Sequence, residues 1–228
     1  MTDREIDALL KRAGAGREAD PALVERLAGS AGRGLTPVRP LPSAWQLAAR
    51  VAVASAVVAI AGALLLGPHG IRLMSGVQEA AIFPLLALWL ALAAAVCVAE
   101  AIPGSRRMIA PWLVVVCACV TLAAVFAGVF HNYATEQFVS QGMRCLVAGL
   151  AQAVPAAAAT WWILRRGFAV NPRAAGFAGG ALAGLAGVLM LEIHCPNFEA
   201  PHVIVWHVAV VPLAGALGML AGRMRAGR

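Results

Sequence analysis

The side chains best suited to chemistry gather in one stretch of the sequence, from Glu192 to His207. These sixteen residues hold three of the five histidines, one of the five cysteines and two of the eleven acidic residues. Thiolate, imidazole and carboxylate groups bind transition metals, and a thiol can also change its redox state. Two prolines and Asn197 predict a loop in the middle of this stretch, between two apolar helices.

The elements that must position these residues are membrane helices. The chain of 228 residues is 61% hydrophobic and 13% charged, whereas soluble domains are about half apolar and about 25% charged. Six apolar runs have about the 20 residues that a membrane helix needs. They are Trp45–Leu66, Glu79–Ala101, Ile109–Phe130, Met143–Leu164, Ala174–Leu191 and Val203–Ala221. The sequence therefore predicts an all-α fold, with a six-helix transmembrane bundle over residues 45–228 and a short N-terminal tail over residues 1–44.

Lys and Arg residues are distributed unevenly around the predicted helices. With the tail on the inner side, only Arg72 and Arg144 of the 18 basic residues fall outside, so both termini are predicted to be cytoplasmic. The excess positive charge flanks the apolar runs, and for this reason the net charge of +7 does not indicate direct binding of nucleic acid. The histidines show the opposite pattern, since all five are predicted in or near the outer loops.

Two short amphipathic helices are predicted in the tail. The second begins at Asp20 and Pro21, which suit the N-cap and the first helical position. The apolar residues of the two stripes are Ile6, Leu9 and Leu10 in the first helix, and Leu23 and Leu27 in the second. Helices this short need a surface on which to fold. The tail is therefore either a disordered leader or a segment whose apolar stripes bind a partner.

Cys145 and Cys195 are predicted at the outer ends of two different helices, where an oxidising compartment permits disulfides. Three interpretations remain open: a permanent disulfide, a redox-switchable pair, and a metal site. The candidate metal ligands are Cys145, Cys195, His194, His202 and His207, and their donor types suit zinc, cadmium or copper. The spacing of five residues between His202 and His207 does not place both on one face of an α-helix. The other three cysteines are expected to pack inside apolar helices.

No nucleotide-binding loop, serine-hydrolase motif or zinc-protease motif occurs in the sequence, so no enzymatic activity is expected. A small metal transporter or channel, with the outer His and Cys residues as its entry site, is an alternative function. Against it, no charged residue lies near the middle of a predicted helix to form a pathway. Gln152 is the one strongly polar side chain at that depth, and a hydrogen bond between helices explains it as well.

These features together resemble the NrsF-like anti-sigma factors (negative regulators of sigma F). The resemblance rests on the six spans after a short tail, on Cys145 at the outer start of the fourth span, and on His194-Cys195-Pro196 followed by Trp206-His207. It implies that the tail holds an extracytoplasmic-function sigma factor at a bacterial inner membrane. It also implies that the outer cysteine pair receives a stress signal. The combined hypothesis is a membrane-bound anti-sigma factor that releases its sigma factor on a periplasmic redox or metal signal.

Overall fold

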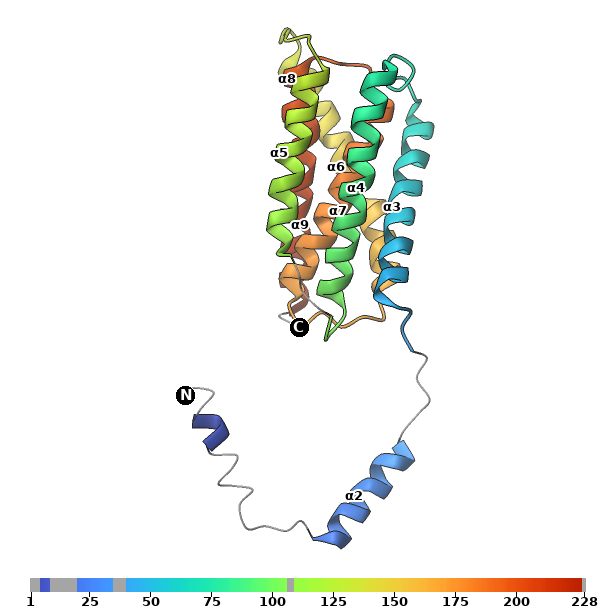
Figure 1. Ribbon diagram of the computed structural model, residues 1–228, viewed down its shortest axis with the longest axis vertical. Helices are drawn as coiled ribbons and strands as arrows, with labels where there is room; N and C mark the ends of the chain where they lie inside the picture. The colour runs from blue at the N-terminus through green and yellow to red at the C-terminus, as the bar shows by residue number, and fades with distance from the viewer. Residues whose placement is uncertain (1–4, 9–19, 35–39, 106–108, 227–228) are drawn as a thin grey trace. The chain divides into compact units, whose positions relative to one another are not determined.

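The computed structural model describes residues 5–8, 20–34, 40–105 and 109–226. Within these residues, six helices are long and apolar enough to cross a membrane, which confirms the predicted all-α fold. The first five are α3 (Ala44–Leu66), α4 (Gly76–Ala101), α5 (Pro111–Val129), α6 (Phe138–Leu164) and α7 (Pro172–His194). The last span, Ala200–Met224, combines α8 (Ala200–His202), the π-helical turn η1 (Val203–His207) and most of α9 (Val208–Ala226). The six spans run side by side (Figure 1).

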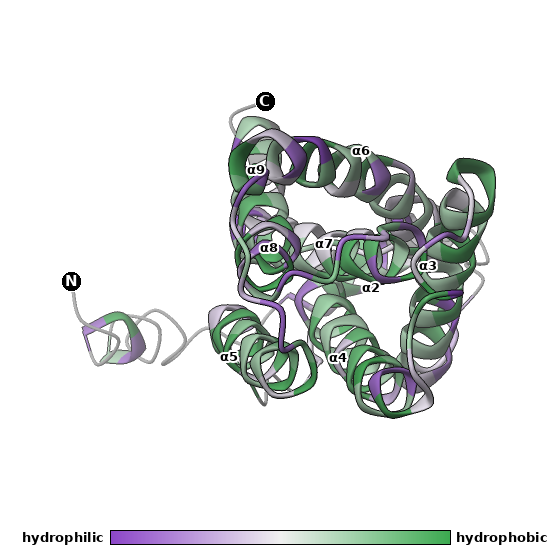
Figure 2. Ribbon diagram, turned by 90° about the horizontal axis from the view of Figure 1, so that it is seen from above, coloured by the Kyte–Doolittle hydropathy of each residue, from purple (hydrophilic) through white to green (hydrophobic). Residues whose placement is uncertain are grey.

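Helix α7 is the centre of the bundle. Figure 2 shows it surrounded by α6, α9, α4 and α3. About 72% of its most apolar segment is buried inside the protein, compared with 22–44% for the other five spans. This helix is rich in Ala and Gly, and small side chains of this kind let the backbones of membrane helices approach one another closely. The two ends of α7 therefore hold fixed positions relative to the helices around it.

The closest approach is between α7 and α9. A Cβ atom on Gly180 would overlap the carbonyl oxygen of Ala214, and a Cβ atom on Gly218 would overlap that of Gly176. These small residues of the fifth span thus lie directly against the sixth span. At these positions the absence of a side chain is a requirement of the contact.

Gly180→Ala is therefore expected to destabilise the bundle by about 1–3 kcal/mol, because the added methyl group overpacks the contact between α7 and α9. Gly128→Ala in α5 is the matched control, since nothing lies within 4 Å of the position that its Cβ would take. Thermal unfolding of the two purified variants in detergent measures the difference. Equal unfolding midpoints would contradict this packing.

Gln152, the polar side chain noted within the fourth span, makes a contact between helices. Its Nε2 donates a hydrogen bond to the carbonyl oxygen of Val58 in α3 at 2.8 Å. A Cβ atom on Gly62, one turn further along α3, would overlap the Gln152 amide, so the glycine makes room for it. This bond accounts for Gln152 as a packing residue between α3 and α6.

Two helix boundaries differ from the predicted ones in ways that affect the site. Helix α6 begins at Phe138 instead of Met143, so Cys145 lies about two turns inside the helix. Polar and small residues lower the hydropathy of these first turns but do not interrupt helical hydrogen bonding. The last span begins at Ala200, three residues before its predicted start, and Val203–His207 forms a π-helical turn.

The loop that carries Cys195 is fixed to two neighbouring loops by backbone hydrogen bonds. The N–H of Gly70 donates to the carbonyl oxygen of His194 at 3.1 Å. The N–H of Ala200 donates to the carbonyl oxygen of Asn132 at 2.6 Å. Because both ends of the loop are held in this way, the connections between α3 and α4 and between α5 and α6 help to position Cys195.

In the tail, the structure describes a helical turn at residues 5–8 and the helix α2 (Pro21–Gly34). The N–H of Ala22 donates to the Asp20 carboxylate at 3.0 Å, which confirms the predicted N-cap. The apolar residues predicted to bind a partner are Ile6 (37% exposed), Leu27 (59% exposed), Leu23 (within α2), and Leu9 and Leu10 (outside the described residues).

Candidate functional site

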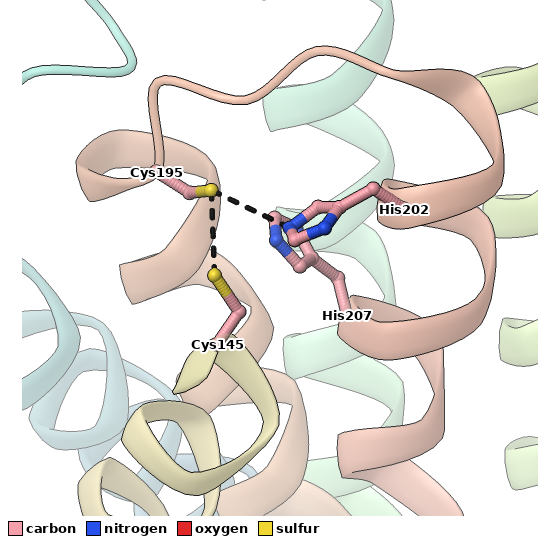
Figure 3. Close-up of side chains that lie close together, drawn as sticks. All are labelled: Cys145, Cys195, His202 and His207. Atoms are coloured by element: carbon pink, nitrogen blue, oxygen red, sulfur yellow. Dashed lines mark hydrogen bonds between the residues drawn. The ribbon is translucent and has the colours of Figure 1, made fainter. Parts of the chain in front are cut away.

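Four of the predicted site residues lie together at one end of the bundle. They are Cys145, Cys195, His202 and His207, and their candidate donor atoms all lie within 4.8 Å of one another (Figure 3). The two Sγ atoms are 3.5 Å apart, and Cys195 Sγ lies 3.7 Å from Nε2 of His202. Helix α6, the segment after α7 and the last span each contribute to this group, which is called the Cys/His cluster below.

The π-helical turn explains how both histidines reach the cluster. Residues five apart point about 140° away from each other on an α-helix. A π-helix closes its hydrogen bonds between residues i and i+5, so residues at that spacing lie nearly one above the other. His202 directly precedes this turn and His207 is its last residue, and their ring centroids are 5.2 Å apart. The structure thus differs from the expectation of separate faces, because the local helix type is not the regular one.

Glu192 orients His207 from outside the cluster. Its Oε1 lies 2.6 Å from Nδ1 of His207, and both side chains are only 1% exposed. With Nδ1 bonded to the carboxylate, Nε2 is the ring nitrogen left for the cluster, and within the described part of the chain it has no hydrogen-bond partner. A carboxylate–histidine pair of this kind fixes the ring and raises ligand basicity at many metal centres. This role of Glu192 was not predicted from the sequence, where the available signal is a carboxylate in the last turn of an apolar helix.

The donor types and distances of the cluster fit a four-coordinate metal ion. Two thiolates on one tetrahedral zinc ion lie about 3.8 Å apart when each S–Zn distance is about 2.3 Å. The sulfurs here are 3.5 Å apart. Two cysteines and two histidines form a common ligand set for zinc, and soft thiolates also suit copper and cadmium.

The same pair of sulfurs is also close to disulfide geometry. All five cysteines are among the described residues and are free thiols in this structure. Starting from 3.5 Å, the two sulfurs need to approach by about 1.5 Å to reach the bond length of a disulfide. A small movement of α6 toward the loop after α7 would suffice. Both a redox reaction and metal binding are therefore compatible with the observed positions.

The surroundings of Cys195 raise the pKa of its thiol. Its pKa is raised above the ordinary thiol value, first by the hydrogen bond that it shares with Cys145 and then by burial. The imidazoles of His202 and His207 oppose this effect by stabilising the thiolate. The neighbouring residues thus favour a thiol at rest and also supply groups that can stabilise its deprotonated form.

The structure does not bring His194 into the cluster. Its Nδ1 lies 2.8 Å from the carbonyl oxygen of Gly67, and its ring centroid is 5.9 Å from that of His69. Among the remaining cysteines, Cys97 and Cys119 pack in the bundle, as expected, but Cys117 is exposed on α5. Cys117 and Cys119 are two residues apart on one helix, so they point to different faces.

The fold and the site define a membrane protein of six apolar helices with a candidate Cys/His centre at one end of the bundle. A family model described as "Negative regulator of sigma F" (NrsF) matches residues 32–225. The chain therefore belongs to the NrsF family, a family of anti-sigma regulators. This result confirms the resemblance found in the sequence.

A curated relative gives a more local match. The probable anti-sigma-F factor NrsF of Azospira oryzae is 38% identical over 52 residues. The aligned segment covers 23% of this chain and 24% of the relative, so about three quarters of each protein lie outside the match. No solved structure matches the chain.

Proposed function

We propose that this protein is a membrane-bound anti-sigma factor that senses a redox or metal signal. Residues 1–44 hold an extracytoplasmic-function sigma factor, and residues 45–228 release it when Cys145 and Cys195 are oxidised or bind a metal. Membership of the NrsF family and the name of the relative from Azospira oryzae support a sigma factor as the partner. The observation that carries the sensing role is the meeting of three membrane spans at one Cys/His cluster.

The distribution of charge supports an orientation in a bacterial inner membrane with both termini in the cytoplasm and the cluster in the periplasm. Arg165 ends α6, Arg173 lies in the first turn of α7, and Arg223 lies in the last turns of α9. These are the helix ends remote from Cys195. Basic residues accumulate on the cytoplasmic side of membrane proteins, so the opposite end is the periplasmic one.

Two reactions can change the chemical state of Cys145 and Cys195: oxidation to a disulfide and binding of a metal ion. In oxidation, the two sulfurs form a disulfide while two protons and two electrons pass to an oxidant such as a peroxide, which is reduced. In metal binding, the cation replaces the thiol protons, which are released to solvent. Both reactions fix the distance between α6 and the loop after α7, because Cys145 belongs to the first and Cys195 to the second.

Close packing beneath the cluster supports transmission along α6. Cys145 and Gly149 are one turn apart, and a Cβ atom on Gly149 would crowd the side chains of Leu191 and Val210. Because α6 meets α7 and α9 without free space here, a movement at Cys145 is passed to the helix as a whole. A coupling free energy of about 1–3 kcal/mol would change the affinity for the sigma factor by about 5- to 150-fold.

The role of the tail is tested with Leu27→Asp, which places a carboxylate in the apolar stripe of α2. Burial of a leucine side chain contributes about 1.5–3 kcal/mol, so we expect at least about tenfold weaker binding of the sigma factor. Gly29→Asp is the matched control, because it lies about 200° around the same helix and has nothing within 4 Å of its Cβ position. Co-purification of the tagged sigma factor with each full-length variant from membranes measures retention. Equal retention by both variants and the wild type would argue against the tail as the binding segment.

A further inference from the structure

A cavity lies in the half of the bundle opposite the Cys/His cluster. Its volume is about 810 Å³, and it is lined by residues of α4, α6, α7 and α9 and of the connection between α6 and α7. Most of the lining is Ala, Gly and other apolar residues. Trp161 of α6 and Leu217 of α9 line it and are 49% and 57% exposed, so the cavity opens on the outward face of the bundle between these two helices. In a membrane this face is turned toward lipid.

Two polar side chains interrupt the apolar lining. Thr160 is only 5% exposed, and its hydroxyl has no hydrogen-bond partner among the residues that the structure describes. A buried hydroxyl without a partner is unfavourable, so this position favours a ligand with a hydrogen-bond acceptor. Arg165 ends α6 at the rim, with its guanidinium carbon 4.0 Å from the centroid of the Trp162 ring. Stacking on Trp162 uses the face of the guanidinium group. The N–H donors of the group lie in its plane, so they remain available to bind a ligand.

We propose that this cavity binds an anionic glycerophospholipid. An acyl chain of the lipid packs against the small residues of α7 and α9. The hydroxyl of Thr160 donates a hydrogen bond to an ester carbonyl oxygen of the lipid, and Arg165 binds its phosphate. The two polar residues are five positions apart on α6, which separates them by about 7.5 Å along the helix. Their order matches that of a lipid, whose ester groups lie deeper in the membrane than its phosphate. This site is separate from the Cys/His cluster and does not depend on the proposed sensing.

Charge at this end of the bundle selects the headgroup. Arg165 lines the cavity at this end, and basic pockets between membrane helices bind anionic headgroups. Trp161 and Phe168 also line the cavity. Tryptophan is enriched at membrane interfaces, and the phenylalanine ring offers a large apolar surface for contact with a lipid. An anionic lipid offers an acceptor to the Thr160 hydroxyl, a negative charge to the Arg165 guanidinium and an apolar chain to the cavity wall.

The test uses the full-length protein in vesicles of phosphatidylcholine with a minor fraction of phosphatidylglycerol. After extraction in mild detergent, native mass spectrometry counts the lipids that remain bound. The wild type is expected to retain phosphatidylglycerol in preference to phosphatidylcholine. Arg165→Gln lowers this retention by about fivefold, whereas Arg166→Gln, which does not line the cavity, leaves it unchanged. Thr160→Val, which removes only the hydroxyl, also lowers retention.

A second pair of variants tests the cavity itself. Gly179 lines it, and the nearest atom to its Cβ position is Sγ of Cys97 at 3.7 Å. Gly179→Leu therefore extends into the cavity without striking backbone, and it is expected to abolish lipid retention. Gly128→Leu adds the same side chain to α5, where space is open, and leaves retention unchanged.

Three results would overturn the proposal. The first is equal retention of phosphatidylcholine and phosphatidylglycerol by the wild type. The second is an equal loss in Arg165→Gln and Arg166→Gln, which would mean that surface charge alone attracts the lipid. The third is equal retention by Gly179→Leu and Gly128→Leu, which would place the lipid outside the cavity.

Discussion

Cys145→Ser and Cys195→Ser are each expected to abolish release of the sigma factor on treatment with oxidant or metal. A serine hydroxyl cannot form a disulfide, and it is a poor ligand for soft metals at neutral pH. In the wild type we expect treatment to weaken sigma-factor binding by about 5- to 150-fold, and in either variant we expect no change. Transcription from a promoter that depends on the sigma factor, measured in intact cells before and after treatment, reports the difference.

Cys117→Ser is the matched control for these two variants. Cys117 is an exposed free thiol on α5, so its loss removes a cysteine without altering the cluster. This variant is expected to respond as the wild type does. The amount of each protein in the membrane fraction shows whether insertion is retained. A normal response in both Cys145→Ser and Cys195→Ser, with normal insertion, would refute the sensing role of the cysteine pair.

Glu192→Gln is expected to lower the affinity of the purified protein for zinc by about 10- to 100-fold. The carboxylate accepts a hydrogen bond from Nδ1 of His207 and thereby fixes the ring with Nε2 toward the sulfurs. An amide of the same size keeps the packing but removes the negative charge that raises the basicity of the imidazole. Competition with a chromophoric chelator in detergent measures the affinity of each protein.

Glu136→Gln is the control for the change of charge, because Glu136 is exposed in the connection between α5 and α6. Its zinc affinity should equal that of the wild type. Oxidation of the cysteine pair should also survive in Glu192→Gln, since the two sulfurs are unchanged. Wild-type zinc affinity in Glu192→Gln would show that His207 does not bind the metal in the orientation described here.

The six spans were predictable because the hydropathy of each run is high over nearly its whole length. The start of α6 was predicted five residues too late, because Ser140, Gln141 and Gly142 are compatible with a helix but lower the local hydropathy. The position of Cys145 two turns inside α6 follows from that difference. The close contact of α7 with α9 was only partly predictable, because small residues along a membrane helix indicate a packed face but do not identify the partner helix.

The chemistry of the cluster was predictable from residue types, and its exact composition was not. His194 and His202 both lie near Cys195 in the sequence, but a hydrogen bond to the carbonyl oxygen of Gly67 directs His194 elsewhere. The pairing of His202 with His207 depends on a π-helical turn, which no simple spacing rule predicts. The role of Glu192 depends on its contact with His207, which lies fifteen residues later in the sequence, beyond the loop. A tertiary contact of this kind cannot be predicted from residue spacing alone.

In the proposed mechanism, the Cys/His cluster controls binding of the sigma factor by residues 1–44. The affinity of the sigma factor for the full-length protein in proteoliposomes is measured before and after Cys145 and Cys195 are oxidised or bind a metal. Alkylation mass shift verifies the conversion in the same sample. We predict that the oxidant or metal that protects both thiols also weakens sigma-factor binding by about 5- to 150-fold. An unchanged affinity with both thiols fully protected would contradict this account.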